Sequence, residues 1–90
     1  MLWFVMNQSG FRDWKVLCWN MRGLNSEARQ LAVKQKIDES GCSVVCLQDT
    51  KCMHIDHRFI RKFCPRRFDN FSYVPSVGAS AGMIIIWNIN

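Results

Sequence analysis

Acidic residues are scarce in this sequence, and it contains no long apolar run. Seven Asp and Glu stand against twelve Lys and Arg, which gives a net charge of +5. This charge suits a polyanionic partner, although a basic surface that only aids solubility is the simpler interpretation. No apolar run approaches the roughly 18 residues of a membrane-spanning helix. The start, MLWFVMNQSG, lacks the basic and long apolar regions of a secretory signal. We therefore expect a soluble intracellular chain without a membrane partner.

The sequence also lacks a CxxC pair, although it has five cysteines. They are Cys18, Cys42, Cys46, Cys52 and Cys64. Because their number is odd and three lie inside or beside apolar runs, buried free thiols in a reducing compartment are the simplest interpretation. A zinc site could be drawn from Cys52, His54, His57 and Cys64. Their spacing matches none of the usual ligand pairs, so we disfavour it.

Hydrophobic patterning predicts alternating strands and helices after residue 14. The expected strands are 15–19, 44–48, 71–75 and 83–88, and the expected helices are 27–40 and 56–63. Ser26 is a suitable N-cap for the first helix, and Gly41 suits the position just past its C-terminus. Residues 1–14 are expected to form an N-terminal extension before a domain that spans 15–90.

The first expected helix has a thin apolar stripe. Ala32, Val33 and Ile37 form it, and Arg29 and Lys36 fall on the same face by the helical period. We expect these two side chains to extend along the stripe with their charged ends in water, or the helix to be only partly covered. Trp19 and Trp87 lie within apolar strands, which favours core packing over base stacking.

Two polar side chains follow the first two expected strands. Asn20 ends the strand 15–19, and Asp49 comes directly after 44–48. The strand–helix–strand order makes these strands parallel, so their carboxyl ends lie at the same edge of the sheet. Ligand sites in open sheets favour that edge. From position alone, a solvated Asp49 paired with Lys51 and a turn-forming Asn20 remain the simpler alternatives.

Three stretches carry a family resemblance: VLCWNMRGLNS at 16–26, VVCLQDTK at 44–51 and GASAGMIIIWN at 78–88. In this order and at these intervals they resemble the start of the endonuclease/exonuclease/phosphatase superfamily, whose fold is DNase I-like. The closest likeness is to the apurinic-endonuclease-like endonuclease domain of plant LINE-type (non-LTR) retrotransposons. The resemblance implies an α/β (α+β) fold, namely the N-terminal part of a four-layered αββα sandwich with the order β-α-β-α-β-β.

The resemblance also implies metal-dependent hydrolysis of DNA, and with it a nuclear location. Asp49 matches the acidic residue that binds the divalent metal, usually Mg²⁺, while Asn20 and Lys51 match residues of the catalytic network. Carboxylate and amide oxygens suit Mg²⁺. A set of basic residues is the candidate for nucleic-acid binding, with a solvated face as the simpler alternative. The set is Arg22, Arg58, Arg61, Lys62, Arg66 and Arg67.

The sequence departs from the family pattern in three places. Asp49 stands where the family has Glu, which withdraws the carboxylate by about 1 Å. Ala81 replaces a glycine in the loop before 83–88, and it would be strained if that position had a positive φ. The family's later Tyr, Asp-x-Asn and Ser-Asp-His motifs have no match here, since His54 and His57 lie elsewhere.

We therefore expect an N-terminal fragment of a retrotransposon endonuclease domain that is inactive alone and binds Mg²⁺ weakly. Two alternatives remain open: a basic nucleic-acid-binding remnant without catalysis, and an active nuclease or phosphatase completed by another chain. The expected strands are apolar on both faces, and two helices can cover only one face. We therefore also expect self-association through the exposed apolar sheet.

Overall fold

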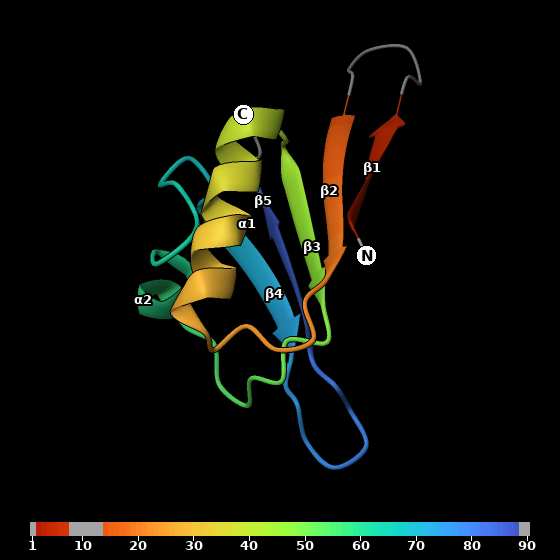
Figure 1. The fold of residues 1–90 in the computed structure, drawn as a ribbon, viewed down its shortest axis with the longest axis vertical. Helices are drawn as coiled ribbons and strands as arrows, with labels where there is room; N and C mark the ends of the chain where they lie inside the picture. Colours follow the sequence, from red (N-terminus) through yellow and green to blue (C-terminus); the bar gives the residue numbers. More distant parts are fainter. Residues whose placement is uncertain (1, 8–13, 89–90) are drawn as a thin grey trace.

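The computed structural model describes residues 2–7 and 14–88, which form a mixed α/β unit (Figure 1). Its elements are β1 (Leu2–Asn7), β2 (Trp14–Asn20), α1 (Glu27–Ser40), β3 (Val44–Gln48), α2 (His57–Ile60), β4 (Asn70–Val74) and β5 (Met83–Trp87). The strands form one sheet of five in the order β1-β2-β3-β5-β4. β2 and β3 are parallel, and the other neighbouring pairs are antiparallel. The α/β class expected from the sequence is therefore confirmed.

Strand β1 lies in the segment that the sequence analysis placed outside the domain. It pairs antiparallel with β2, with Leu2 opposite Trp19 and Asn7 opposite Trp14. Its sequence, LWFVMN, is rich in residue types that favour strands, and the pairing occupies an edge that β2 would otherwise leave open. The predicted order β-α-β-α-β-β therefore lacked its first strand, and part of the expected extension 1–14 belongs to the sheet.

Helix α1 begins and ends where the sequence predicted. The hydroxyl of Ser26 accepts a hydrogen bond from the N–H of Arg29 at 3.4 Å. Gly41 has φ 64°, and its N–H donates to the carbonyl of Ile37 at 3.2 Å. Glycine adopts this left-handed conformation without strain, which is why it ends helices so often. The strands on either side of α1 are parallel, as predicted.

Helix α2 is shorter than the predicted 56–63. Asp56 caps it, and its carboxylate accepts the N–H of Phe59 at 2.9 Å. Beyond the helix, the N–H groups of Lys62 and Phe63 donate to the carbonyls three residues back, not four. The chain therefore tightens into turns, because this bond pattern does not continue an α-helix.

The core lies between the helices and one face of the sheet (Figure 1). α1 buries Val33 and Ile37, as predicted, whereas Ala32 is only half-buried. Its third buried residue is Gln30, whose amide Nε2 donates to the carbonyl of Leu24 at 3.0 Å. The fully buried strand residues on this face are Leu17, Val45, Leu47, Ile84 and Ile86. Trp19 packs against this core, as expected.

The opposite face of the sheet carries no helix within the described ranges, since both helices lie on the same side (Figure 1). Its apolar side chains from β2 to β5 are Val16, Cys18, Val44, Cys46, Val74, Met83, Ile85 and Trp87. We call this the uncovered face. Trp87 was expected in the core and is half-buried on this face instead. The described residues thus form two layers, a helical layer on a sheet, and the four-layered sandwich is not confirmed.

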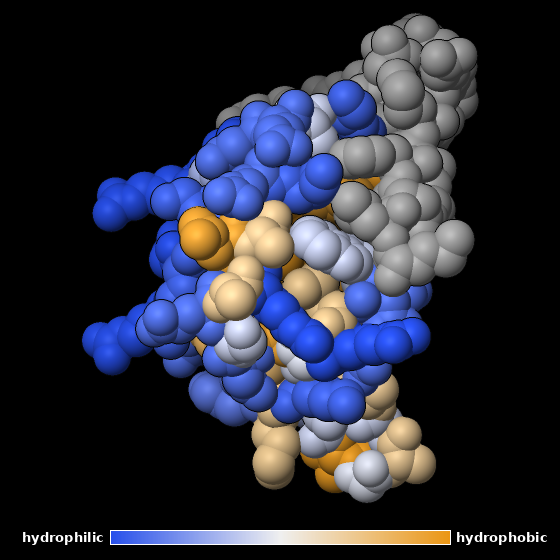
Figure 2. Space-filling model, viewed as in Figure 1, coloured by the Kyte–Doolittle hydropathy of each residue, from blue (hydrophilic) through white to orange (hydrophobic). Residues whose placement is uncertain are grey.

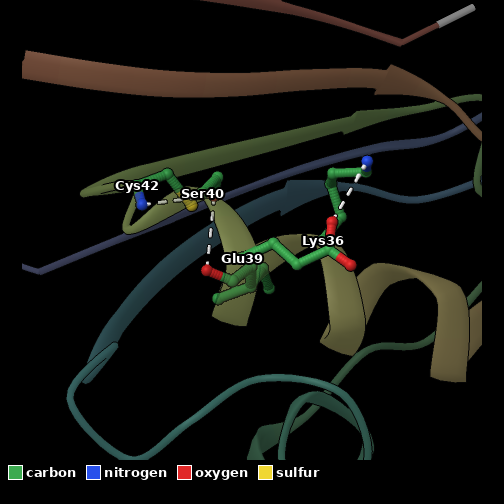
Figure 3. A network of polar contacts seen from close by, with 5 residues as sticks. Lys36, Glu39, Ser40 and Cys42 are labelled. Atoms are coloured by element: carbon green, nitrogen blue, oxygen red, sulfur yellow. Dashed lines mark hydrogen bonds and ion pairs between the residues drawn. The ribbon is translucent and has the colours of Figure 1, made fainter.

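The C-terminal end of α1 is held by polar contacts (Figure 3). Lys36, expected on the apolar stripe, is half-buried and forms an ion pair with Glu39 at 3.5 Å. The hydroxyl of Ser40 accepts the N–H of Cys42 at 3.3 Å, and its carbonyl accepts the ammonium of Lys15 at 2.8 Å. These contacts fix the turn between α1 and β3.

The surface in the view of Figure 2 is mostly hydrophilic, and apolar side chains gather at its lower end. The large apolar side chains that remain exposed are Leu31, Met53, Val74 and Val77. Val74 and Val77 belong to the end of β4 and the loop that follows it, which lies at the lower end of Figure 1. This loop also borders the edge of the sheet at which β2 and β3 end.

Buried thiols of the core, Cys64 above all, give the stability a dependence on pH. Burial raises the pKa of Cys64 from its ordinary 9.0 to about 12, and burial likewise raises the pKa of Cys42. The folded state therefore holds the proton more tightly, so this stabilisation is complete below pH 9 and is lost as the pH rises towards 12. We expect the ionisation of Cys64 to lower the free energy of unfolding by about 1.4 kcal/mol per pH unit between pH 9 and about 12. Urea denaturation at rising pH measures this slope. A slope that Cys64→Ala leaves unchanged would contradict the assignment.

Candidate functional site

The ends of β2 and β3 lie side by side, as predicted for parallel strands. Asn20 is paired in register with Gln48, the residue before Asp49. Beyond the strands the pairing continues, because the N–H of Gly23 donates to the carbonyl of Asp49 at 2.7 Å. On the other side, the N–H of Lys51 donates to the carbonyl of Ala81 at 2.9 Å. The segment 49–51 is therefore held between the loop after β2 and the loop before β5.

Three residues at this edge have a backbone that non-glycine residues rarely adopt. Arg22, Asp49 and Lys51 have φ values of 52°, 54° and 56°. In the loop before β5 the positive φ values fall on Gly78, at 57°, and Gly82, at 88°, and Ala81 is free of that strain. The departure at Ala81 from the family pattern therefore costs no backbone strain. Strained residues concentrate at binding and catalytic sites, which makes this edge the strongest candidate in the described part of the chain.

Asp49 has a carboxylate oxygen that the fold leaves without a partner. Its Oδ1 is buried and has no hydrogen-bond partner. A buried carboxylate oxygen without a partner is unfavourable, and a bound cation would offset that cost. The burial of this oxygen does not fit the alternative in which Asp49 is fully solvated and paired with Lys51.

The other two residues of the predicted site are exposed. Asn20 closes β2 in register and does not form the turn that was its simpler interpretation. The Lys51 side chain points out of the core, while its carbonyl accepts the amide of Asn25 at 3.4 Å. The structure thus brings Asn20, Asp49 and Lys51 to one edge by their backbones.

The oxygen donors of this edge fit a hard divalent cation only in part. Asp49 offers a carboxylate and Asn20 an amide, both suitable for Mg²⁺. No group of three or more His, Cys, Asp or Glu placed to hold a metal occurs among residues 2–7 and 14–88. Water or a ligand would therefore have to complete the coordination shell.

Arg29 supports the site in a way that the sequence analysis missed. Its Nη1 donates to the carbonyls of Met21, at 2.5 Å, Arg22, and Gly23, at 3.3 Å. Arg29 therefore clamps the loop after β2, and it does not lie along the apolar stripe of α1. The sequence signal that could have suggested this role is an arginine in the first turn of a helix that follows a loop containing glycine.

Thr50 is a second supporting residue that was missed. It is completely buried between the two loops, and its hydroxyl accepts the N–H of Cys52 at 3.4 Å. Its own N–H donates to the carbonyl of Gly82 at 3.2 Å. Thr50 therefore anchors the segment that carries Asp49.

The predicted nucleic-acid-binding residues divide into two groups. Arg61 is occupied within the fold, since its guanidinium donates to the carbonyls of Cys64, Pro65 and Phe68. The guanidinium of Arg67 lies 4.7 Å from the ring centre of Phe68, and the ammonium of Lys62 lies 5.8 Å from that of Phe59. The others, all exposed, are Arg22, Arg58 and Arg66. Arg22 alone follows β2 at the candidate edge.

The histidines do not assemble a zinc site. His54 lies 3.7 Å from the carboxylate of Asp56, and His57 packs edge-on against the ring of Phe71 with centres 5.0 Å apart. Cys52 donates to the carbonyl of Thr50 at 3.3 Å. These contacts give the zinc interpretation no support.

Comparison with known proteins adds no assignment. A scan against protein-family models gave no match, and a search of curated proteins found no relative of this chain. Across the parts that the structure describes, no helix is long and apolar enough to span a membrane. The fold is a mixed α/β layer. Its edge around Asp49 is polar and has a strained backbone.

Proposed function

We propose that this chain carries the metal-binding edge of a phosphodiesterase domain, the N-terminal part of a DNA endonuclease domain of retrotransposon origin. The observation that supports it is the buried, unpartnered Oδ1 of Asp49 at the edge where two parallel strands end. The sequence resemblance assigns the metal to this same carboxylate. The clamp made by Arg29 supports the proposal further, because it holds the neighbouring loop in place.

In this proposal Asp49 and Asn20 hold a divalent cation, Mg²⁺ by its preference for oxygen donors. When bound, such a cation polarises a phosphoryl oxygen and offsets negative charge. The exposed cations of Lys51 and Arg22 stand on the same edge and would contact the phosphates of a DNA strand. Their role is to bind and orient the substrate.

We expect no turnover of supercoiled or abasic DNA by this chain with Mg²⁺ or Mn²⁺. Hydrolysis needs a base for the attacking water and groups that orient the phosphate. The sequence contains neither an Asp-x-Asn nor a Ser-Asp-His motif, and His57 packs against Phe71. A nicking assay on plasmid DNA checks this. Turnover that Asp49→Ala abolishes would mean that this chain carries a complete active site.

The metal site itself is tested by Asp49→Asn. Asparagine tolerates the positive φ, and its neutral amide lacks the charge that would attract a cation. We expect Mg²⁺ at ten times its Kd to stabilise the original chain by about 1.4 kcal/mol, and the variant not at all. Thermal melts with and without Mg²⁺ measure both responses.

Asp38→Asn is the matched control, since Asp38 is exposed on α1. This variant should keep the full response to Mg²⁺. An equal response in Asp49→Asn would remove Asp49 from the site and with it the main support of the proposal.

The second candidate is DNA binding without catalysis. It is favoured by the exposed Arg58, Lys62 and Arg66 near α2, together with the net charge of +5. DNA binding that weakens steeply with salt, and that Mg²⁺ and Asp49→Asn leave unchanged, would select this candidate.

A further inference from the structure

Two cysteines face each other on the uncovered face of the sheet. Cys18 of β2 and Cys46 of β3 are direct partners in the parallel register. They alternate with Leu17 and Val45, which point into the core, and so both belong to the face that neither helix covers. β2 and β3 are inner strands of the sheet, with neighbours on both sides. The backbone therefore holds the Cα atoms of the two cysteines at the spacing of neighbouring strands.

The two thiols are close enough to interact. Burial raises the pKa of the Cys46 thiol, and the neighbouring Cys18 raises it further through its charge and a hydrogen bond. Both cysteines are free, and Cys46 keeps part of its surface exposed. Cys18 is buried, at 8% exposure. A reagent that approaches the uncovered face therefore meets Cys46 first, with Cys18 as its direct partner in the register.

A second pair of cysteines in the chain provides a contrast. Cys42 and Cys64 also influence each other, but they lie in the core beneath the helices at 2% and 4% exposure. Cys52, at 4%, is buried beside Thr50. In the part that the structure describes, Cys18 and Cys46 are therefore the one pair of neighbouring thiols with a partly exposed member.

We propose that Cys18 and Cys46 form a dithiol site that chelates a soft, thiophilic ion of low coordination number, such as trivalent arsenic. Soft ions prefer thiolate sulfur, and two thiols fixed on a sheet are already arranged to bind as a pair. Among the described residues, no His, Asp, Glu or further Cys joins them in a group that could hold a metal ion. An ion that accepts two sulfur ligands and carries its own third group satisfies this arrangement.

Phenylarsine oxide is the probe. Its arsenic forms one bond to each sulfur, the two thiol protons leave with the arsenic-bound oxygen as one water molecule, and no oxidant is needed. We expect one adduct per chain by mass spectrometry of the dilute, folded protein. A small dithiol should release it, whereas an excess of a monothiol should not, because only a chelate resists the monothiol.

Single variants locate the adduct. Cys18→Ser and Cys46→Ser should each abolish it, and Cys42→Ser should leave it unchanged. Cys18→Ala and Cys46→Ala, which keep an apolar side chain on the face, provide a second pair should a serine variant unfold. An adduct that survives in both pairs, or that Cys42→Ser removes, would overturn the proposal. Asp49→Asn should leave the adduct intact, which separates this site from the proposed metal site.

Discussion

Replacing Gly82 with alanine is expected to destabilise the chain by about 3 kcal/mol or more. Gly82 has φ 88°, which already disfavours any side chain. A Cβ added there would lie 2.6 Å from the hydroxyl of Thr50 and 3.3 Å from the backbone nitrogen of Ser76. Thr50 cannot yield easily, because it is completely buried and its hydroxyl accepts the N–H of Cys52. The substitution should therefore displace the segment that carries Asp49.

Gly78→Ala is the matched control for this substitution. Gly78 lies in the same loop with φ 57°, but a Cβ there would meet nothing within 4 Å. Only the left-handed backbone is strained, so we expect a loss of about 1 kcal/mol. Urea denaturation of both variants measures the difference. Equal losses would mean that the contact between Gly82 and Thr50 does not govern the packing of this loop.

The elements that the sequence predicted well depend on local signals. Ser26 and Gly41 mark the two ends of α1, and both form the caps that their residue types favour. The strand–helix–strand order fixes the parallel pairing of β2 and β3, and so it places Asn20 beside the segment of Asp49. The shared edge could therefore be predicted before any coordinates were known.

The parts that the sequence did not predict depend on contacts between distant residues. β1 was missed because a short apolar segment becomes a strand only when β2 offers it an edge. α2 was predicted too long because Phe59 and Phe63 recur at a helical interval, although Phe63 is buried from a turn. Arg61 was expected to bind nucleic acid. It instead donates to three backbone carbonyls, which only the fold of the segment after α2 brings together.

The candidate site likewise combines features that the sequence predicted with features that depend on distant contacts. Residue identities suggested Asp49 as the metal ligand, but the burial of its Oδ1 follows from the loops that flank it. The supporting roles of Arg29 and Thr50 arise from the same loops. Sequence periodicity does not predict contacts of this kind, because each contact joins segments that only the fold brings together.

The uncovered face leads to the second large effect, a contrast between two neighbouring residues of β5. Ile84 is completely buried in the core, and Ile85 points to the uncovered face. We expect Ile84→Lys to destabilise the chain by more than about 4 kcal/mol and to unfold it, because it buries a charge without a partner. We expect Ile85→Lys to fold, since its ammonium reaches water across the open side of the sheet.

The same pair of variants tests association. On the uncovered face, no described helix lies over the half-buried Val16, Val44, Ile85 and Trp87, and open apolar faces of this kind promote association. We therefore expect the original chain to self-associate and to bind an apolar dye, and Ile85→Lys to be monomeric with weaker dye binding. Sedimentation velocity, dye fluorescence and thermal melts decide the outcome. If the original chain is a monomer that melts cooperatively and binds no dye, the face is closed by the chain itself. The expected association, and the access to Cys18 and Cys46 from that side, would then both be wrong.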